Sequence, residues 1–552
     1  MHKRIPLSLL CTSLLTAQTQ KPNILFILTD QQSSTMMSCA GNDKLTTPAI
    51  DKLAANGVRF TKAYCANPVS LPSRFALFTG HFASEAGIRY NDDHVNKDSV
   101  AAICKRGTLG SIFRDAGYQT LYGGKIHLPW TSTKALQTRM SETYGFNNYF
   151  TSDERGELAR QSAQFLSNFK STDKPFCMVV SLINPHDICF FWNDKMYNET
   201  RPAEIPEESW YHVKDLINKK NGMSDEDYKS QVPLFPINHA PMTNAPVLDT
   251  YQKFSDKNKL DFYSWSYHRL TELVDSEVDI ILKSLESSAA KENTIVVFSS
   301  DHGDMNGAHQ LIMKSRIYDE SSKVPFIFSG PGIRKNVVDD ETIVNNGLDL
   351  IPTLCDLAGI AVYKGLTGKS LKSQLTMLEP VPLERQYVFY ETAIAYVCMD
   401  NRYKYALYDG KGTIEVLLDL KNDPKETTNI AYSVQHKDTR DKMHKVLTEY
   451  MSTRNLVLNP DVTRMPKNGD DGIVASLMPA KVKRKAYCLN SRIIIPEIQD
   501  QLFVTAYNSN GTLIWSTSTT NATFISDPMP KGTYFLQLSE GGKQEGLKIS
   551  VN

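Results

Sequence analysis

Residues 68–80 read Pro-Val-Ser-Leu-Pro-Ser-Arg-Phe-Ala-Leu-Phe-Thr-Gly. Proline is favoured in the first turn of a helix because its missing N–H costs nothing there, so Pro72 predicts a helix that begins near Ser70. The free N–H groups and the dipole of a helix N-terminus attract an anion, and Arg74 lies one turn farther on, on the same face. A hydroxyl, a fixed cation and a helix N-terminus would therefore meet at one point, which suits an oxyanion ester. Taken alone, the same residues are explained slightly better by an ordinary capped helix.

The chain has 552 residues, too many for one ordinary core, so we expect two or more domains. Apolar residues make up 41% and charged residues 22%, values typical of a soluble globular protein. Lys+Arg and Asp+Glu are equal at 61 each, so the net charge does not favour nucleic acid as a partner. Any anion site must then be a local cluster of cations.

Residues 1–20 are predicted to be a signal peptide, because Lys3 and Arg4 precede an apolar run to Leu15 and small residues around Ala17. No other apolar run is long enough to span a bilayer. We therefore expect a periplasmic or secreted protein without a membrane span. The cysteines lack metal-ligand spacing and are expected to be mostly buried apolar residues.

A continuous apolar run over residues 23–29 ends at Asp30 and indicates a buried parallel strand. Between the apolar runs lie helical patterns, such as the apolar positions from Leu270 to Leu285. The sequence therefore predicts an α/β fold, a mostly parallel sheet covered by helices on both faces. Ligands of such sheets bind beyond the carboxyl ends of the strands. Similar apolar runs occur at Phe176–Ile183, Thr294–Ser299 and Val324–Ser329.

From Tyr387 the pattern changes to short strands with polar turns, followed by a helical stretch over 438–451. This indicates a smaller α+β subdomain. Residues near the C-terminus alternate in strand fashion and predict an appended β-sandwich module. The expected divisions are a signal peptide at 1–20, a catalytic domain at 21–380, a C-terminal subdomain at 381–456, a linker at 457–485 and the β-sandwich module at 486–552.

Ser70-Leu71-Pro72-Ser73-Arg74, with Leu77 and Thr79-Gly80 behind it, resembles the signature of the type I sulfatases, which belong to the alkaline phosphatase-like superfamily. The likeness runs from about residue 21 to about residue 456. In that family the first residue of the signature, Cys or Ser, is oxidised to formylglycine (3-oxoalanine). The resemblance implies a bacterial sulfatase of the serine type, in which Ser70 is the modified residue.

The resemblance also implies a Ca²⁺ site. Sulfatases bind Ca²⁺ through two acidic residues after the first strand and an Asp-Asn or Asp-His pair after a later one, here Asp30-Gln31 and Asp301-His302, together with the residue at position 70. Oxygen ligands favour a hard cation such as Ca²⁺, although a single Asp at a strand end is more often a helix cap. Gln31 stands where many members have a second Asp. Its amide oxygen can coordinate but brings no charge, so its part in the site stays open.

Three further motifs match the family. Gly124-Lys125-Ile126-His127 resembles its Gly-Lys-x-His motif, and residues two apart in an extended segment project to the same side. Asn184-Pro185-His186 resembles its Pro-His step, although a structural histidine at a turn explains His186 equally well. The block that begins at Asp301 continues to His309 and Lys314.

The resemblance implies a role for each of these residues. A formylglycine hydrate at position 70 would attack sulfur, while Arg74, Lys125 and Lys314 bind the sulfate oxygens. His186 or His309 would protonate the departing alcohol, a transfer worth about 10²–10⁴-fold. His127 would take the proton as the hemiacetal collapses.

The implied function is hydrolysis of a sulfate ester in a sulfated sugar, a glycan or glycosaminoglycan fragment, with a formylglycine-generating maturation enzyme as partner. His186 would also contact this substrate. A sugar subsite is expected from aromatic, arginine and histidine side chains, namely Trp192, Tyr90, His94, Arg89 and Arg402. Two alternatives stay open: a phosphodiester or phosphonate hydrolase of the same superfamily, and an inactive carbohydrate-binding protein whose Ser70 is never oxidised.

Overall fold

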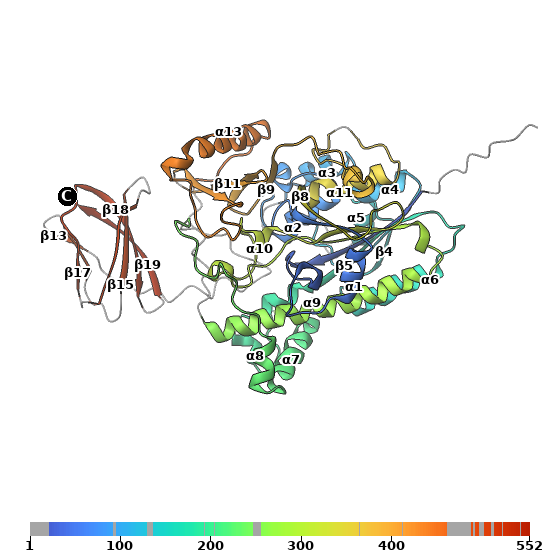
Figure 1. Ribbon diagram of the computed structural model, residues 1–552, viewed down its shortest axis with the longest axis horizontal. Coiled ribbons are helices and arrows are strands. Elements are labelled where there is room, and N and C mark those ends of the chain that lie inside the picture. Colours follow the sequence, from blue (N-terminus) through green and yellow to red (C-terminus); the bar gives the residue numbers. More distant parts are fainter. Residues whose placement is uncertain are drawn as a thin grey trace, which may run out of the picture.

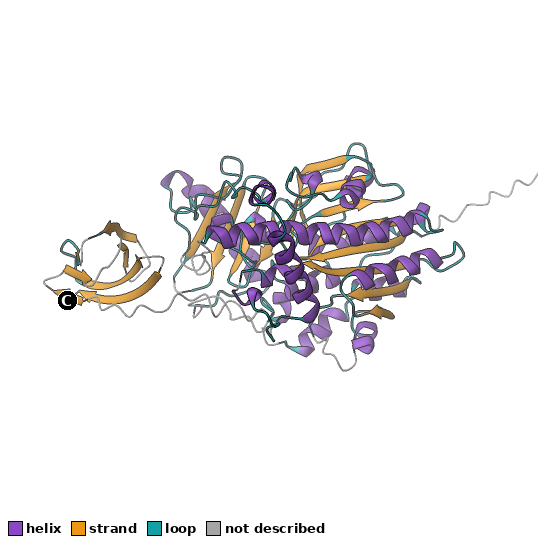
Figure 2. Cartoon of the chain, turned by 90° about the horizontal axis from the view of Figure 1, so that it is seen from below, coloured by secondary structure: helices purple, strands orange, loops and turns teal. Residues whose placement is uncertain are grey.

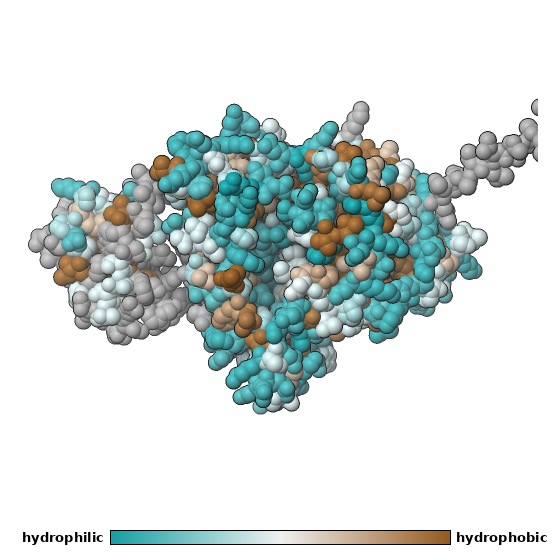
Figure 3. Space-filling view, in the orientation of Figure 1, coloured by the Kyte–Doolittle hydropathy of each residue, from teal (hydrophilic) through white to brown (hydrophobic). Residues whose placement is uncertain are grey.

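The computed structural model describes residues 21–91, 95–129, 136–192, 194–203, 205–246, 256–363, 365–410, 412–460, 487–489, 492–495, 502–508, 513–520, 523–540 and 543–551. The predicted signal peptide, His94 and residues 461–485 of the predicted linker lie outside these described residues. No helix in these ranges is both long and apolar enough to cross a membrane. On the face shown in Figure 3, apolar residues form separate groups on a largely hydrophilic surface.

An eight-stranded sheet with the order β4-β3-β5-β1-β6-β7-β2-β8 forms the centre of the molecule (Figure 1). The predicted strands are confirmed as β1, β5, β6 and β7. Their partners in the sheet, whose patterns were not identified in the sequence, are β2, β3, β4 and β8. The bounds are β1 (Asn23–Asp30), β2 (Gly57–Tyr64), β3 (Gln119–Gly124), β4 (Asn148–Thr151), β5 (Phe176–Pro185), β6 (Thr294–Ser300), β7 (Phe326–Ser329) and β8 (Val337–Asn345).

The direction of β7 differs from the prediction. The apolar run Val324–Ser329 predicts a parallel strand like the others, but β7 is antiparallel to both β6 and β2. Residues 301–325 join β6 to β7 through loops, the 3-10 helix Ala308–Gln310 and the short helix α10 (Asp319–Ser322), and they hold no long helix of the kind that usually carries the chain between parallel strands. A strand buried on both faces reads as a continuous apolar run in either direction, so the run could not reveal this.

Helices cover both faces of the sheet, as predicted. Side chains of β1 alternate between two cores: Phe26 packs in one with residues of α2 (Ser70–Thr79), and Ile27 packs in the other with residues of α9 (Lys257–Glu286). Figure 1 shows α3, α4 and α11 on one side of the sheet and α6 and α9 on the other, and Figure 2 shows long helices lying along the strands. The remaining helices are α1 (Pro48–Ala55), α3 (Lys97–Cys104), α4 (Leu109–Asp115), α5 (Leu136–Glu142), α6 (Gly156–Asn168), α7 (Glu207–Asn221), α8 (Asp225–Gln231), α11 (Asn346–Leu357) and α12 (Lys372–Thr376).

A second, antiparallel sheet with the order β12-β11-β10-β9 packs against α13 (Lys437–Thr453). This is the smaller α+β part of the predicted fold class, and it contains one strand, β10, that the sequence pattern did not reveal. Its strands are β9 (Val388–Glu391), β10 (Ala395–Met399), β11 (Tyr403–Tyr408) and β12 (Ile414–Asp419).

The C-terminal residues form two small antiparallel sheets, β13-β14-β17 and β16-β15-β18-β19, which Figure 1 draws to one side of the main body. Apolar residues of both sheets share one core, including Ile493 and Val504, so the arrangement is that of the expected sandwich. The strands are β13 (Tyr487–Leu489), β14 (Arg492–Ile495), β15 (Leu502–Asn508), β16 (Leu513–Thr519), β17 (Phe524–Ile525), β18 (Gly532–Glu540) and β19 (Lys543–Val551).

Candidate active site

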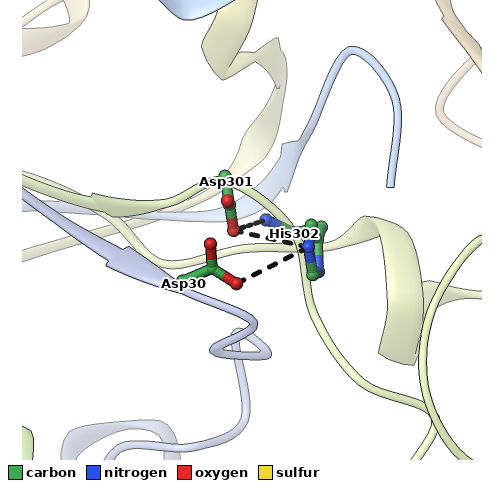
Figure 4. A group of neighbouring side chains, drawn as sticks. All are labelled: Asp30, Asp301 and His302. Atoms are coloured by element: carbon green, nitrogen blue, oxygen red, sulfur yellow. Dashed lines mark hydrogen bonds and ion pairs between the residues drawn. The ribbon is translucent and has the colours of Figure 1, made fainter. Parts of the chain in front are cut away.

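Two strand ends and one helix start meet at a single edge of the large sheet. β1 and β6 are parallel neighbours with Thr29 beside Ser300, so Asp30 and Asp301 leave the sheet side by side. Ligand atoms of Asp30, Asp301 and His302 all lie within 4.8 Å of one another, and all three side chains are buried (Figure 4). Helix α2 begins at Ser70 as predicted.

Arg74 binds the two carboxylates of this cluster. Its Nε donates to Oδ2 of Asp301 at 2.8 Å and its Nη2 donates to Oδ2 of Asp30 at 3.0 Å. Nη1 donates to the hydroxyl of Ser181 and to the carbonyl of Lys125, and the whole side chain is buried. The expectation that Arg74 binds sulfate oxygens is therefore corrected: the guanidinium holds the carboxylates in place. The sequence could place Arg74 on the face of Ser70 but could not show which groups face it.

The two carboxylates have different proton affinities. Burial raises the pKa of Asp30, but Lys125, His186 and Arg74 outweigh burial and hold this pKa well below its usual value. For Asp301, burial together with the charge of Asp30 raises the pKa to about 7. Asp301 is therefore the more easily protonated of the two carboxylates, and a bound cation would favour its charged form.

The cluster has the donor atoms for a divalent cation. Oδ1 of Asp30 is buried and has no hydrogen-bond partner among the described residues. It lies 3.8 Å from Nε2 of His302, and Oδ1 of Asp301 lies 3.6 Å from the same nitrogen. Burial and the charge of Lys314 hold the pKa of His302 well below its usual value, so the ring is neutral. An unsatisfied carboxylate oxygen of Asp30, next to the carboxylate of Asp301 and a neutral imidazole, fits a metal ion.

Gln31 follows Asp30 with a left-handed backbone, φ 69°, and is fully buried. Its amide oxygen accepts hydrogen bonds from Nζ of Lys314 at 3.0 Å and from the thiol of Cys189 at 3.2 Å. Its amide nitrogen donates to Oδ2 of Asp304 at 2.7 Å. The amide oxygen that could ligate a cation thus already has two hydrogen-bond donors.

Two lysines border the cluster, as expected. Lys125 follows directly on β3 and places Nζ 2.8 Å from Oδ2 of Asp30. Lys314 reaches Gln31 from the loop between β6 and β7. The two side chains are nearly buried, with relative exposures of 7% and 6%. Two ammonium groups in such a buried place can bind a dianion strongly, because the low dielectric strengthens the attraction.

Of the three candidate histidines, His127 and His186 are affected by the charges of Lys125, Lys314 and Asp30. Burial and the charge of Lys125 lower the pKa of His127 to about 3 and hold the pKa of His186 well below its usual value. Asp30 and Lys314 act on both rings. Both histidines are therefore neutral in the free protein, and an incoming anion would favour their protonated forms.

His309 has other neighbours. The centroid of its ring lies 4.1 Å from that of Tyr318, and its Nε2 lies 3.4 Å from the side-chain nitrogen of Asn238. Burial lowers the pKa of His309 to about 4, and the charges that act on it are those of Asp423 and Lys404. These partners lie outside the cluster of Asp30, which favours His186 over His309 as the leaving-group acid. Motif spacing alone cannot show which way a loop side chain points.

The structure does not bring the described residues of the expected sugar subsite together. Trp192 and Tyr90 are buried in two different apolar clusters. Arg89 pairs with Asp409 at 2.9 Å, with its guanidinium over the ring of Tyr396. These side chains belong to the core and to subdomain contacts, because aromatic and arginine residues serve packing as readily as binding.

Arg402 is likewise not part of a site with the other candidates. It lies in the turn between β10 and β11 and binds both carboxylate oxygens of Asp419, with its Nη2 2.9 Å from Oδ2. The observed contact of Arg402 closes one end of the smaller sheet, and its predicted role in substrate binding stays a prediction.

The structure adds residues that the sequence did not single out. Asp304 binds Gln31, Cys189 donates to the same amide, and Ser181 binds Arg74. Asp304 could have been suspected because it follows directly on the Asp301-His302-Gly303 motif. No comparable signal marks Cys189 or Ser181.

A buried hydroxyl at a helix N-terminus, a candidate cation cluster and two buried lysines define a hydrolase for anionic esters. Comparison with known families gives the class more narrowly: residues 22–360 match the family model Sulfatase, and residues 307–453 match the model for the C-terminal part of N-sulphoglucosamine sulphohydrolase. The chain belongs to the sulfatase family, and it is an enzyme, a hydrolase of sulfate esters. The predicted family is thereby confirmed.

Named relatives and solved structures agree with this assignment. A Delta 4,5-hexuronate-2-O-sulfatase of Bacteroides thetaiotaomicron is 31% identical over 80% of this chain and 91% of its own length. An N-acetylglucosamine-6-O-sulfatase of the same organism is 26% identical over 80% of this chain and 88% of its own. A solved structure described as a 2-O GAG sulfatase has a TM-score of 0.63 and 27% identity over 80% of this chain and 95% of its own. A phosphonate monoester hydrolase of Agrobacterium radiobacter, at 20% identity over 79% of this chain and 96% of its own and a TM-score of 0.60, shares the fold.

Proposed function

We propose that this sulfatase removes sulfate from a sulfated sugar, a glycan or glycosaminoglycan fragment. The observation that carries the proposal is the contact between Ser70 and the candidate cation cluster: Oγ of Ser70 lies 3.0 Å from Nε2 of His302. The substrate class is supported by the names of the relatives, which act on a hexuronate and on N-acetylglucosamine.

We propose Ca²⁺ as the cation, held by Asp30, Asp301 and His302 together with the residue at position 70. Carboxylate oxygens are the ligands that calcium prefers. Bound there, the ion would lower the pKa of a neighbouring hydroxyl and screen the charge of the incoming ester. Arg74 keeps both carboxylates in position for it.

We propose that Ser70 is converted to formylglycine, which would supply the nucleophile. An unmodified serine would need an adjacent general base, and the neighbouring His302 is the proposed metal ligand. Ser70 is fully buried in the folded chain, as is the rest of α2. A maturation enzyme must therefore reach it before folding, so the predicted maturation partner would act on the unfolded chain.

The remaining residues bind the ester and move protons. Lys125 and Lys314 supply ammonium donors to the sulfate oxygens, where charge is spread in the transition state. His186 donates a proton to the departing sugar oxygen, since the charges of Asp30, Lys125 and Lys314 act on its ring, whereas those of Asp423 and Lys404 act on His309. His127 accepts a proton in the later step that releases sulfate from position 70, and its low pKa in the free protein keeps the ring unprotonated until then.

Two measurements test the proposal. The first is the mass of the peptide that contains Ser70, taken from protein made in the native host; a loss of two hydrogens supports the enzyme. An intact serine would contradict the proposed formylglycine, because the proposed nucleophile would be missing.

The second measurement is release of sulfate or phosphate from a panel of an aryl sulfate, a phosphate diester and sulfated sugars, with and without a calcium chelator. Sulfate release that depends on calcium and is fastest with a sulfated sugar supports the proposal. Faster cleavage of the phosphate diester would instead support the phosphodiester or phosphonate hydrolase.

A further inference from the structure

The amide of Gln31 lies between a buried carboxylate and a buried ammonium group. Its Nε2 donates to Oδ2 of Asp304 at 2.7 Å, and its Oε1 accepts from Nζ of Lys314 at 3.0 Å. A carboxylate can only accept and an ammonium can only donate. The two partners therefore decide which end of the amide carries the oxygen, and turning the amide over would set donor against donor at Lys314.

Asp304 is itself held firmly. Its side chain is fully buried. The hydroxyl of Tyr263 donates to the same Oδ2 at 2.7 Å, and the backbone N–H of Asn306 donates to Oδ1 at 2.7 Å. Three donors, including Gln31, fix the carboxylate in one orientation, so it presents a constant acceptor to the amide.

We propose that Asp304 is a positioning residue for Lys314: it orients the Gln31 amide, whose oxygen then holds the ammonium group where a sulfate oxygen is to bind. The inference rests on the proposed function, because it takes Lys314 to be a sulfate-binding residue. The carboxylate of Asp304 is thus linked to Lys314 through the neutral amide of Gln31, which binds both.

The arrangement matters because a lysine is poorly fixed by its own covalent structure. The ammonium group sits on a flexible four-carbon stem with three rotatable donors, while a displacement of about 1 Å in a binding group can cost about 100-fold in rate. A chain of hydrogen bonds in a buried, low-dielectric place strengthens each of its members. The carboxylate of Asp304 thus holds Lys314 through the amide without contacting the substrate.

The test is calorimetric binding of inorganic sulfate to the full mature chain loaded with calcium. In Asp304→Asn, the new amide must turn a donor toward either Gln31 or the N–H of Asn306. The Gln31 amide loses its fixed orientation, and we expect sulfate to bind about 10-fold more weakly. The same variant should raise KM for a sulfated substrate by a similar factor.

Tyr263→Phe is the matched control. It removes the other donor to the same oxygen of Asp304 and leaves the bond to Gln31 in place. We expect its melting temperature to fall while its affinity for sulfate stays within about twofold of the wild type. Equal losses of affinity in Tyr263→Phe and Asp304→Asn would overturn the inference, because packing around Asp304 would then explain both.

Lys314→Ala separates this inference from the proposed function. If Lys314→Ala binds sulfate as tightly as the wild type does, Lys314 is not a sulfate ligand and both proposals fail. If Lys314→Ala loses affinity and Asp304→Asn does not, the proposed function stands and the positioning role alone is overturned.

The double variant Gln31→Glu with Asp304→Asn keeps the test decisive if Asp304→Asn folds poorly. The carboxylate and the amide exchange places, so the new amide donates to the new carboxylate and Lys314 regains a fixed acceptor. Because the new glutamate adds a negative charge beside Lys314, the double variant is compared with Gln31→Glu alone, which carries the same charge. Tighter sulfate binding in the double variant than in Gln31→Glu supports the proposal, and equal binding in the two variants contradicts it.

Discussion

The hydroxyl oxygen of Ser70 lies 3.0 Å from Nε2 of His302, although 232 positions separate the two residues in the chain. Nδ1 of His302 lies 2.9 Å from the backbone carbonyl of Gly303. A carbonyl only accepts, so the ring proton is on Nδ1 and Nε2 presents its lone pair toward Ser70. The same lone pair serves as a metal ligand when a cation is bound, so the carbonyl of Gly303 fixes the tautomer that the site requires.

Replacement of His302 tests this assignment. In His302→Ala the cluster loses one ligand, and we expect calcium to raise the melting temperature much less than it does in the wild type. A ligand at 100 times its Kd stabilises a protein by about 2.7 kcal/mol, so the wild-type shift is measurable by calorimetry with calcium and with a chelator.

His268→Ala is the control for that experiment. His268 is also buried and also lies with Nδ1 2.7 Å from a backbone carbonyl, that of Ser264, but it stands outside the cluster. We expect this variant to melt earlier with an unchanged calcium shift. Equal calcium shifts in wild type and His302→Ala would remove His302 from the metal site.

Replacement of Arg74 by Met leaves Asp30 and Asp301 facing each other without their shared cation. Removal of one partner of a buried ion pair costs about 3–5 kcal/mol. We expect a loss of this size in the free energy of unfolding without calcium and a smaller loss with calcium, because the ion takes over part of the charge neutralisation. Urea unfolding under both conditions measures the difference.

The exposed ion pair between Arg160 and Glu157, at 2.7 Å, provides the comparison for Arg74→Met. Exposed pairs contribute about 0–1 kcal/mol, so Arg160→Met should change stability little and equally in both conditions. A loss in Arg74→Met that calcium does not reduce would argue against a cation between Asp30 and Asp301.

The sequence predicted the parts of this site that depend on strand ends and motif order. The apolar run before Asp30 and the motif at Asp301 located two strand ends, and the parallel register of β1 and β6 brings them together. The partners of Arg74 could not be predicted, because helical spacing places a side chain on a face without showing what lies opposite. The surroundings of Trp192 and Arg402 could not be predicted for a similar reason: residue type shows neither that Trp192 is buried nor that Arg402 binds Asp419.

The choice of leaving-group acid can be tested with two histidine variants. His186→Ala should lower kcat about 10²–10⁴-fold for a sulfated sugar, whose alkoxide leaves poorly without a proton. For an aryl sulfate with a good leaving group the same variant should lose much less. His309→Ala should affect both substrates alike, since His309 packs against Tyr318 and not in the cluster. Steady-state kinetics with both substrates decide the matter; a selective loss on sugar sulfate in His309→Ala would reverse the assignment.

Glu277 on α9 predicts a pH dependence of stability that is separate from the active site. Its side chain is buried, its Oε2 has no hydrogen-bond partner among the described residues, and burial raises its pKa to about 8. The folded state then binds this proton more tightly than the unfolded state does, so stability falls as pH rises from the unfolded pKa of about 4.3 to about 8.

We expect Glu277→Gln to match the wild type near pH 4 and to be more stable at pH 8, with a gain that grows by up to about 1.4 kcal/mol per pH unit in between. Urea unfolding of both proteins across this range measures the gain. Glu157→Gln, which changes an exposed glutamate, should show no such trend, and a stability difference that does not vary with pH in Glu277→Gln would contradict the buried, protonated carboxyl.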